Sequence, residues 1–88
     1  MSMDKLQLVI VTPCEKIFEG ETDRVLVRTV QGDVAILPRH IDYACALASG
    51  NGYVNVDGKI RPMHIDGGLM YVRENHVRIL ANHFEWRP

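Results

Sequence analysis

Turn-forming residues interrupt this chain at short intervals, and this spacing limits what it can fold into. Asp57 and Gly58 are a strong two-residue hairpin signal, and Pro38 ends an apolar run because proline removes a ladder donor. The segments between such turns are short and rich in β-branched and other apolar residues. They predict strands over residues 6–11, 16–19, 24–30, 34–37, 53–56, 59–65, 69–72 and 77–80, the last two joined as a hairpin around residues 73–76. The expected fold class is therefore all-β, a sandwich or barrel.

Several segments carry more specific expectations. The alternation in residues 6–11 places Leu6, Leu8 and Ile10 on one face of a strand. The unbroken apolar run at 34–37 predicts a strand buried on both faces. Residues 41–49 are interpreted as an irregular crossover that pairs weakly with a sheet edge, although propensity also allows one helical turn there. The glycines at 50 and 52 predict a turn, and residues 82–88 have no strand or helix period.

Length and composition restrict the class of protein. The 88 residues allow one domain, 1–88, and a hydrophobic content of 47% predicts a folded globule. A formal net charge of −1, with both signs mixed along the chain, argues against nucleic acid as the main partner. Apolar runs are too short to span a bilayer, and the start at residues 1–5 does not resemble a signal peptide. We therefore expect a protein of the cytoplasm, with Cys14 and Cys45 reduced.

The residue types do not form a recognisable catalytic or metal-binding pattern. The four histidines lack the paired spacing of a dedicated metal site, and no nucleophile elbow accompanies either cysteine. Gly67 and Gly68 lack the strand-to-helix context of a phosphate loop. We expect no enzyme, no metal and no cofactor, and instead a rigid β domain that presents loops to a partner. The candidate loop residues are Asp33, Arg39, His40 and Asp42, for which ordinary solvated loop positions are the alternative.

Five segments, at residues 8–13, 17–21, 32–40, 66–72 and 75–81, together resemble one known family, the epsilon subunits of F-type ATP synthases. The similarity lies in their order and spacing over nearly the whole chain. Residues 32–40 (Gly-Asp-Val-Ala-Ile-Leu-Pro-Arg-His) are similar to the family's Gly-Asp-Leu-Gly-Ile-Leu-Pro-Gly-His segment. The other segments are 8–13 (Leu-Val-Ile-Val-Thr-Pro), 17–21 (Ile-Phe-Glu-Gly-Glu), 66–72 (Asp-Gly-Gly-Leu-Met-Tyr-Val) and 75–81 (Asn-His-Val-Arg-Ile-Leu-Ala).

The resemblance implies the family's amino-terminal domain, a flattened β-sandwich of about ten short strands. It also implies a non-catalytic place in the central stalk, with the gamma subunit and the loops of the membrane c-ring as partners. The c-ring contact would fall at Gln31, Gly32 and Asp33, and the boundary between gamma and the c-ring at Arg39, His40 and Asp42. The location implied is peripheral, on the cytoplasmic side of the inner membrane. A free-standing β-sandwich module that binds a ligand or a metal is the alternative.

The chain departs from the family pattern at three loop positions and at its end. Ala35 and Arg39 replace glycines, and Asp42 replaces a common proline. If the glycine at position 39 needs positive φ, the loop here must differ. The family usually continues into a carboxy-terminal helical hairpin, and no amphipathic helical stretch follows Leu80. We expect a naturally short subunit rather than an expressed fragment, with no inhibitory or ATP-sensing hairpin.

Overall fold

A computed structural model of the protein describes residues 5–88, and all its regular structure is β-strand. Residues 1–4, which we expected not to form a signal peptide, lie outside the described residues. The eight strands of residues 5–88 are β1 (Leu6–Val11), β2 (Lys16–Thr22), β3 (Arg24–Thr29), β4 (Gly32–Ile36), β5 (Tyr43–Val56), β6 (Lys59–Arg73), β7 (His76–Ala81) and β8 (Phe84–Trp86). Residues 5–88 contain no helix that could span a membrane.

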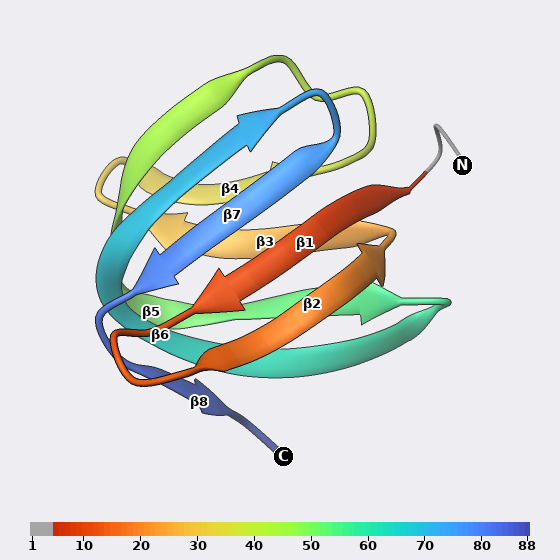
Figure 1. Ribbon diagram of the computed structural model, residues 1–88. Helices are drawn as coiled ribbons and strands as arrows, with labels where there is room; N and C mark the ends of the chain where they lie inside the picture. The colour runs from red at the N-terminus through yellow and green to blue at the C-terminus, as the bar shows by residue number, and fades with distance from the viewer. Residues whose placement is uncertain (1–4) are drawn as a thin grey trace.

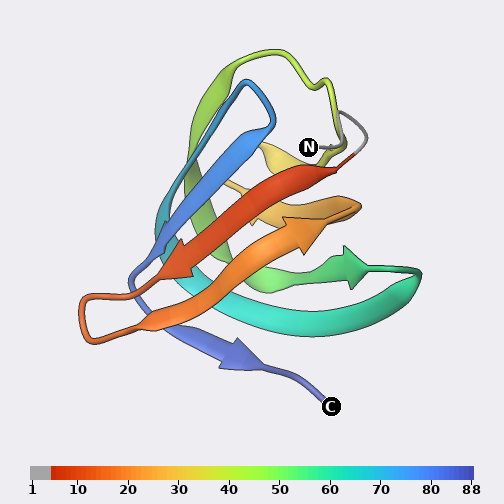
Figure 2. The same ribbon diagram turned by 45° about the vertical axis from the view of Figure 1, so that its right-hand side comes forward.

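The strands form one continuous sheet that folds back on itself. Their order is β2-β1-β7-β6-β5-β3-β4, with β8 added to β6, and every neighbouring pair is antiparallel except β1 and β7. The long strands β5 and β6 curve, so β1 and β7 lie in front of β3 and β4 (Figure 1). The turned view shows the same two layers with β5 and β6 joining them (Figure 2). The all-β sandwich prediction is confirmed, and the count of about ten strands was approximate because β5 and β6 are each continuous.

The core fills the space between the two layers. Leu6, Leu8 and Ile10 of β1 are fully buried, which confirms the predicted alternation in this strand. The same inward alternation is clear in β3 and β7, because successive side chains of a strand point to opposite faces. The remaining buried apolar side chains are Val25, Val27, Ile36, Leu47, Val54, Met63, Ile65, Met70, Val72, Val77, Ile79 and Ala81.

The prediction that residues 34–37 form a core strand buried on both faces was wrong. Strand β4 stands at the end of the strand order and pairs only with β3 among the described strands. Ile36 is fully buried, Val34 and Ala35 are half-buried, and Leu37 is exposed. A short apolar run does not distinguish an edge strand from a central one, since both bury at least one face.

The predicted crossover at 41–49 and the predicted turn at 50–52 were also wrong, because β5 runs through both. Gly52 is a close-approach position: a Cβ placed there would lie 2.0 Å from the Leu26 carbonyl oxygen of β3. Gly68 has the same role in β6, where a Cβ would lie 2.1 Å from the Leu80 carbonyl oxygen. Glycine here lets two backbones meet where the long strands curve between layers.

Two hairpins were predicted correctly, and the tail was not. Asp57 and Gly58 both have positive φ, 52° and 82°, and join β5 to β6 as a primed two-residue turn does. Glu74 and Asn75 join β6 to β7 in the same way, with φ of 50° and 64°. The tail forms β8, which pairs with β6, and a cation–π contact supports it: the Arg61 guanidinium lies 4.0 Å from the centre of the Trp86 ring.

Candidate functional site

The first predicted contact lies at the tip of the β3–β4 hairpin. Thr29 pairs with Gly32, so Val30 and Gln31 form the turn and Gly32 enters β4 with φ of 117°. The buried Thr29 hydroxyl donates to the Gly32 carbonyl oxygen at 2.7 Å and accepts from the Gln31 N–H at 3.0 Å. Gln31, Gly32 and Asp33 are exposed. One buried hydroxyl thus fixes the turn that carries them.

Asp33 is held by an ion pair across this hairpin. Its Oδ1 accepts from Arg28 Nε at 2.9 Å, and the two residues are direct partners in the ladder between β3 and β4. The hydrogen bond from Arg28 holds the pKa of the Asp33 carboxyl below its ordinary value, although partial desolvation opposes the shift. Asp33 therefore stays ionised and paired, with about half of its side chain in solvent.

The second predicted contact lies in the β4–β5 loop, which turns at Pro38 and Arg39. The His40 N–H donates to the Leu37 carbonyl oxygen at 3.1 Å, and Arg39 has φ of 68°. Proline followed by positive φ is the pattern of a type II turn, whose third position favours glycine. The Arg39 N–H donates to Asn75 Oδ1 at 2.6 Å. The loop therefore keeps the left-handed conformation that glycine favours, even though arginine occupies the position.

The remaining predicted loop residues lie beside this turn. His40 is half-buried, with Nδ1 at 2.7 Å from the Ile41 carbonyl oxygen and its ring 5.8 Å from the Tyr43 ring. Asp42 is exposed. Ala35 lies within β4 and is not among the residues with positive φ, so its replacement of glycine is mild. Because the two loops follow opposite ends of β4, the structure separates residues 31–33 from residues 39–42.

Sequence reasoning missed an exposed apolar surface, here called the apolar face. It consists of outward side chains on adjacent strands: Ala44 and Ala46 of β5, Leu69 and Tyr71 of β6, and Leu80 of β7. Leu69 lies between Ala46 and Leu80 in the ladder and is 51% exposed, while Tyr71 is 44% exposed. The sequence signal that could have found it is the alternation of a strand: Met70 and Val72 are buried, so Leu69 and Tyr71 must point outward.

One shallow hollow adjoins the apolar face, and a second lies over β1. One of about 270 Å³ is lined by Val11, Thr12, Pro13, Leu80, Ala81 and Asn82, and so shares Leu80 with the face. Another of about 470 Å³ lies over β1 and is lined by Gln7, Leu8, Val9, Glu19, His76, Val77 and Arg78. An exposed apolar patch with a polar margin and recesses is typical of a protein-binding surface.

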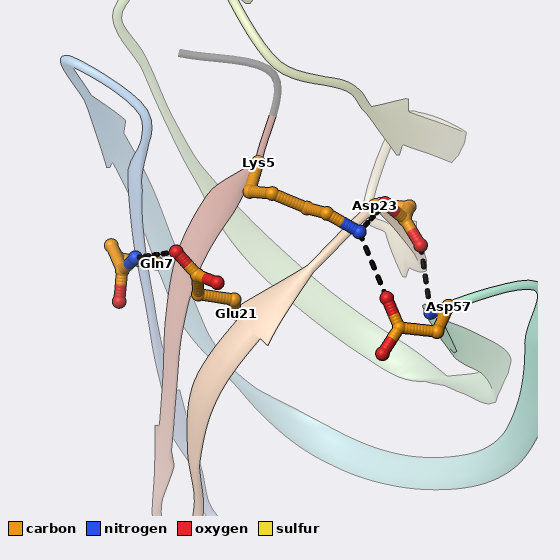
Figure 3. Close-up of polar contacts among 5 residues, drawn as sticks. All are labelled: Lys5, Gln7, Glu21, Asp23 and Asp57. Atoms are coloured by element: carbon orange, nitrogen blue, oxygen red, sulfur yellow. Dashed lines mark hydrogen bonds and ion pairs between the residues drawn. The ribbon is translucent and has the colours of Figure 1, made fainter. Parts of the chain in front are cut away.

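A separate polar cluster ties the start of β1 to two distant turns (Figure 3). Lys5 Nζ forms an ion pair with Asp23 and contacts Asp57 Oδ1 at 3.0 Å. Asp23 Oδ2 also accepts from the Asp57 N–H at 2.8 Å. The hydrogen bond to Asp23 raises the pKa of Lys5, and the hydrogen bond from Lys5 lowers the pKa of Asp23. These contacts join residues 5, 23 and 57, which are far apart in the sequence, so the cluster serves the fold.

The histidines and cysteines do not gather. Within the described chain, no group of three or more His, Cys, Asp or Glu residues could hold a metal ion. His64 Nδ1 lies 2.8 Å from Asn51 Oδ1, and His76 Nδ1 lies 3.0 Å from the Glu74 carbonyl oxygen. Cys14 and Cys45 are free thiols, and burial raises the pKa of Cys45. Each of these histidines has a local partner.

Comparison with known proteins gives one family. Residues 5–87 match the family model described as "ATP synthase, Delta/Epsilon chain, beta-sandwich domain". The chain is 38% identical over 79 residues to the ATP synthase epsilon chain of Halalkalibacterium halodurans, covering 90% of this chain and 59% of that one. It is 36% identical over 86 residues to that of Caldanaerobacter subterraneus, covering 96% and 62%. The chain therefore spans about three fifths of the length of these relatives.

Solved structures share the fold at lower sequence identity. A chain in the cryo-EM structure of the Euglena gracilis mitochondrial ATP synthase, OSCP/F1/c-ring, superposes with a TM-score of 0.89 at 23% identity, covering 94% of this chain and 54% of that one. A chain in the Tetrahymena thermophila mitochondrial ATP synthase central stalk and c-ring gives 0.81 at 15% identity, covering 92% and 66%. These similarities establish the sandwich as a shared fold.

Proposed function

Because the chain belongs to the ATP synthase delta/epsilon β-sandwich family, we propose that it is the epsilon subunit of an F-type ATP synthase central stalk. In this role it is not catalytic: it binds the gamma subunit and touches the c-ring, and so helps couple ion translocation to ATP synthesis. Its place would be peripheral, on the cytoplasmic side of the inner membrane. The relatives named epsilon chains support the assignment, over the part of their length that this chain spans.

The apolar face is the observation that carries the proposal. Leu69 and Tyr71 are 51% and 44% exposed, and they lie on the outer face of β6 beside the exposed Ala44 and Ala46 of β5. A partner that covers them would remove apolar area from water and supply the main driving force for association. The gamma subunit is the partner that a central-stalk role requires at such a surface. The adjoining hollow lined by Val11 and Leu80 would receive side chains of gamma.

The two loops would supply the remaining contacts. The exposed hairpin tip with Gln31, Gly32 and Asp33 suits the polar loops of a c-ring, since a carboxylate at a rim sets register at modest energy. Arg39, His40 and Asp42 would lie at the boundary between gamma and the c-ring. The separation of the loops by the length of β4 lets one rigid strand pair reach two neighbours.

The test is capture of this chain by the gamma subunit of its own host. We expect stable capture of the wild type and at least about a tenfold loss of affinity for Leu69→Asp, because a charge would be buried in the interface. Ile60→Asp is the matched control, since Ile60 is 52% exposed on the other half of the same strand. Asp33→Arg and His40→Ala should reduce coupling in the assembled enzyme more than they reduce gamma binding.

Two outcomes would count against the proposal. If gamma does not capture a folded wild-type chain, the chain shares the fold of the family but not the proposed function. Equal losses of affinity for gamma in Leu69→Asp and Ile60→Asp would show that the apolar face is not the interface.

A further inference from the structure

We infer that Arg28 is a positioning residue for the proposed c-ring contact: it holds the Asp33 carboxylate on a turn fixed by Thr29, so the partner meets a preformed Arg–Asp pair. The inference rests on the proposed function and specifies the chemistry of that contact. It is drawn from the ion pair, the hydroxyl that fixes the turn and the path of the Arg28 side chain.

The turn under the pair is fixed on both sides. Thr29 is buried, and its hydroxyl is both donor and acceptor within the turn. The Val30 N–H donates to the Ala46 carbonyl oxygen of β5 at 3.1 Å, which anchors the tip to the neighbouring strand. Both sides of the tip are thus fixed before a partner arrives. A preorganised element loses less conformational entropy on binding.

The Arg28 side chain runs along a path that a glycine leaves open. A Cβ at Gly50 would lie 2.8 Å from both Cβ and Cδ of Arg28, so the aliphatic part of Arg28 lies directly over Gly50. This placement brings Nε to 2.9 Å from Asp33 Oδ1. The side chain of Arg28 is therefore directed by packing as well as by charge.

The pair presents both signs of charge to a partner. The ion pair joins Arg28 Nε to Asp33 Oδ1, so it does not use the terminal guanidinium nitrogens of Arg28 or Oδ2 of Asp33. Val30, beside them, is 65% exposed. The partner loop should therefore offer a basic or N–H donor for Asp33, an acceptor for Arg28, and an apolar side chain for Val30.

The first experiment follows the Asp33 carboxyl by carbon NMR during a pH titration of this chain. Because Arg28 lowers the pKa of Asp33, Arg28→Gln should return that pKa toward its ordinary value, and Arg28→Lys should restore part of the shift. Arg87→Gln is the matched control: Arg87 and Glu85 are 46% and 50% exposed, against 52% and 47% for Arg28 and Asp33. An Asp33 pKa that does not respond to Arg28→Gln would overturn the inference.

The second experiment compares binding of the chain to epsilon-depleted complexes with and without the c-ring. The ratio of the two affinities isolates the c-ring contribution. We expect Arg28→Gln and Asp33→Asn each to lower this ratio about two- to fivefold, the range of exposed charge contacts, and the double variant to lower it no further. Thr29→Val should lower the ratio as well, while Arg87→Gln should leave it unchanged. Trp86 fluorescence reports that each variant is folded.

The outcomes separate the inference from the function on which it rests. A ratio that falls with Asp33→Asn and not with Arg28→Gln would overturn the positioning role alone. If the wild type gains nothing from the c-ring, the proposed contact is refuted and the inference falls with it. In that case, an Asp33 pKa that still depends on Arg28 would show that the Arg28–Asp33 pair exists and that the proposed c-ring contact is what is wrong.

Discussion

The close approach at Gly52 gives the most direct test of how this sandwich closes. In Gly52→Ala the new methyl group would lie 2.0 Å from the Leu26 carbonyl oxygen and 3.0 Å from its carbon. Ordinary carbon–oxygen contacts need more than about 3 Å, so β3 and β5 would have to separate by about 1 Å. Both atoms belong to backbone that is paired in the sheet, and no flexible side chain is available to move aside.

The cost can be bounded from the size of the overlap. Overpacking a core with side-chain atoms costs about 1–3 kcal/mol, and a clash with paired backbone lies at or above the upper end of that range. A domain of this size has a total stability of about 4–13 kcal/mol. We therefore expect Gly52→Ala to lower the free energy of unfolding by at least about 3 kcal/mol, which is a large share of the total.

Gly20→Ala is the matched control, since it also places alanine at a strand glycine. There the new Cβ would meet the Phe18 ring at 3.5 Å, an ordinary contact, and alanine should be neutral or stabilising by up to about 1 kcal/mol. Urea unfolding followed by the fluorescence of Trp86, the single tryptophan, measures both variants. A Gly52→Ala variant within about 0.5 kcal/mol of wild type would refute the close-approach reasoning.

Two further predictions concern the loops and the polar cluster. Arg39→Gly should have a free energy of unfolding about 1 kcal/mol higher than Arg39→Ala, because only glycine adopts a φ of 68° without strain. Thermal denaturation of both variants measures the difference, and equal stabilities would contradict the prediction. Because Lys5 lowers the pKa of Asp23, this contribution to stability is complete above the ordinary carboxyl pKa and is lost as pH falls through the lowered folded value. Lys5→Met should therefore be less stable than wild type at neutral pH, and the two stabilities should become equal in acid. A difference in melting temperature that does not change with pH would argue against the Lys5–Asp23 pair. Lys59→Met is the control.

Local periodicity was enough to predict most strands and the main hairpins. The inward alternation of Leu6, Leu8 and Ile10 depends only on the period of a strand. The hairpin at Asp57 and Gly58 depends only on the positive φ angles that a two-residue turn requires. The glycines at 50 and 52 could not be interpreted in this way. Glycine serves a turn or a close approach equally well, and the Leu26 carbonyl that decides between them comes from a distant strand.

The candidate site was predictable in part for the same reason. The loops at the two ends of β4 follow from Gly32 and Pro38, which are local signals. The apolar face was not identified because it is assembled from three strands. Two of its members, Ala44 and Ala46, lie in the segment that sequence patterns indicated as an irregular crossover. Whether an apolar side chain is covered depends on layer order, which a local pattern does not contain.

The apolar face and the hairpin tip are mechanically joined. Ala46 contributes its side chain to the apolar face, and its carbonyl oxygen accepts from the Val30 N–H at the tip. Thr29 also pairs with Leu47, the next residue of β5. No linker intervenes between the surface proposed for gamma and the hairpin proposed for the c-ring. In the proposed role, such stiffness would let the chain pass rotation between gamma and the c-ring, because a flexible connection would absorb part of it.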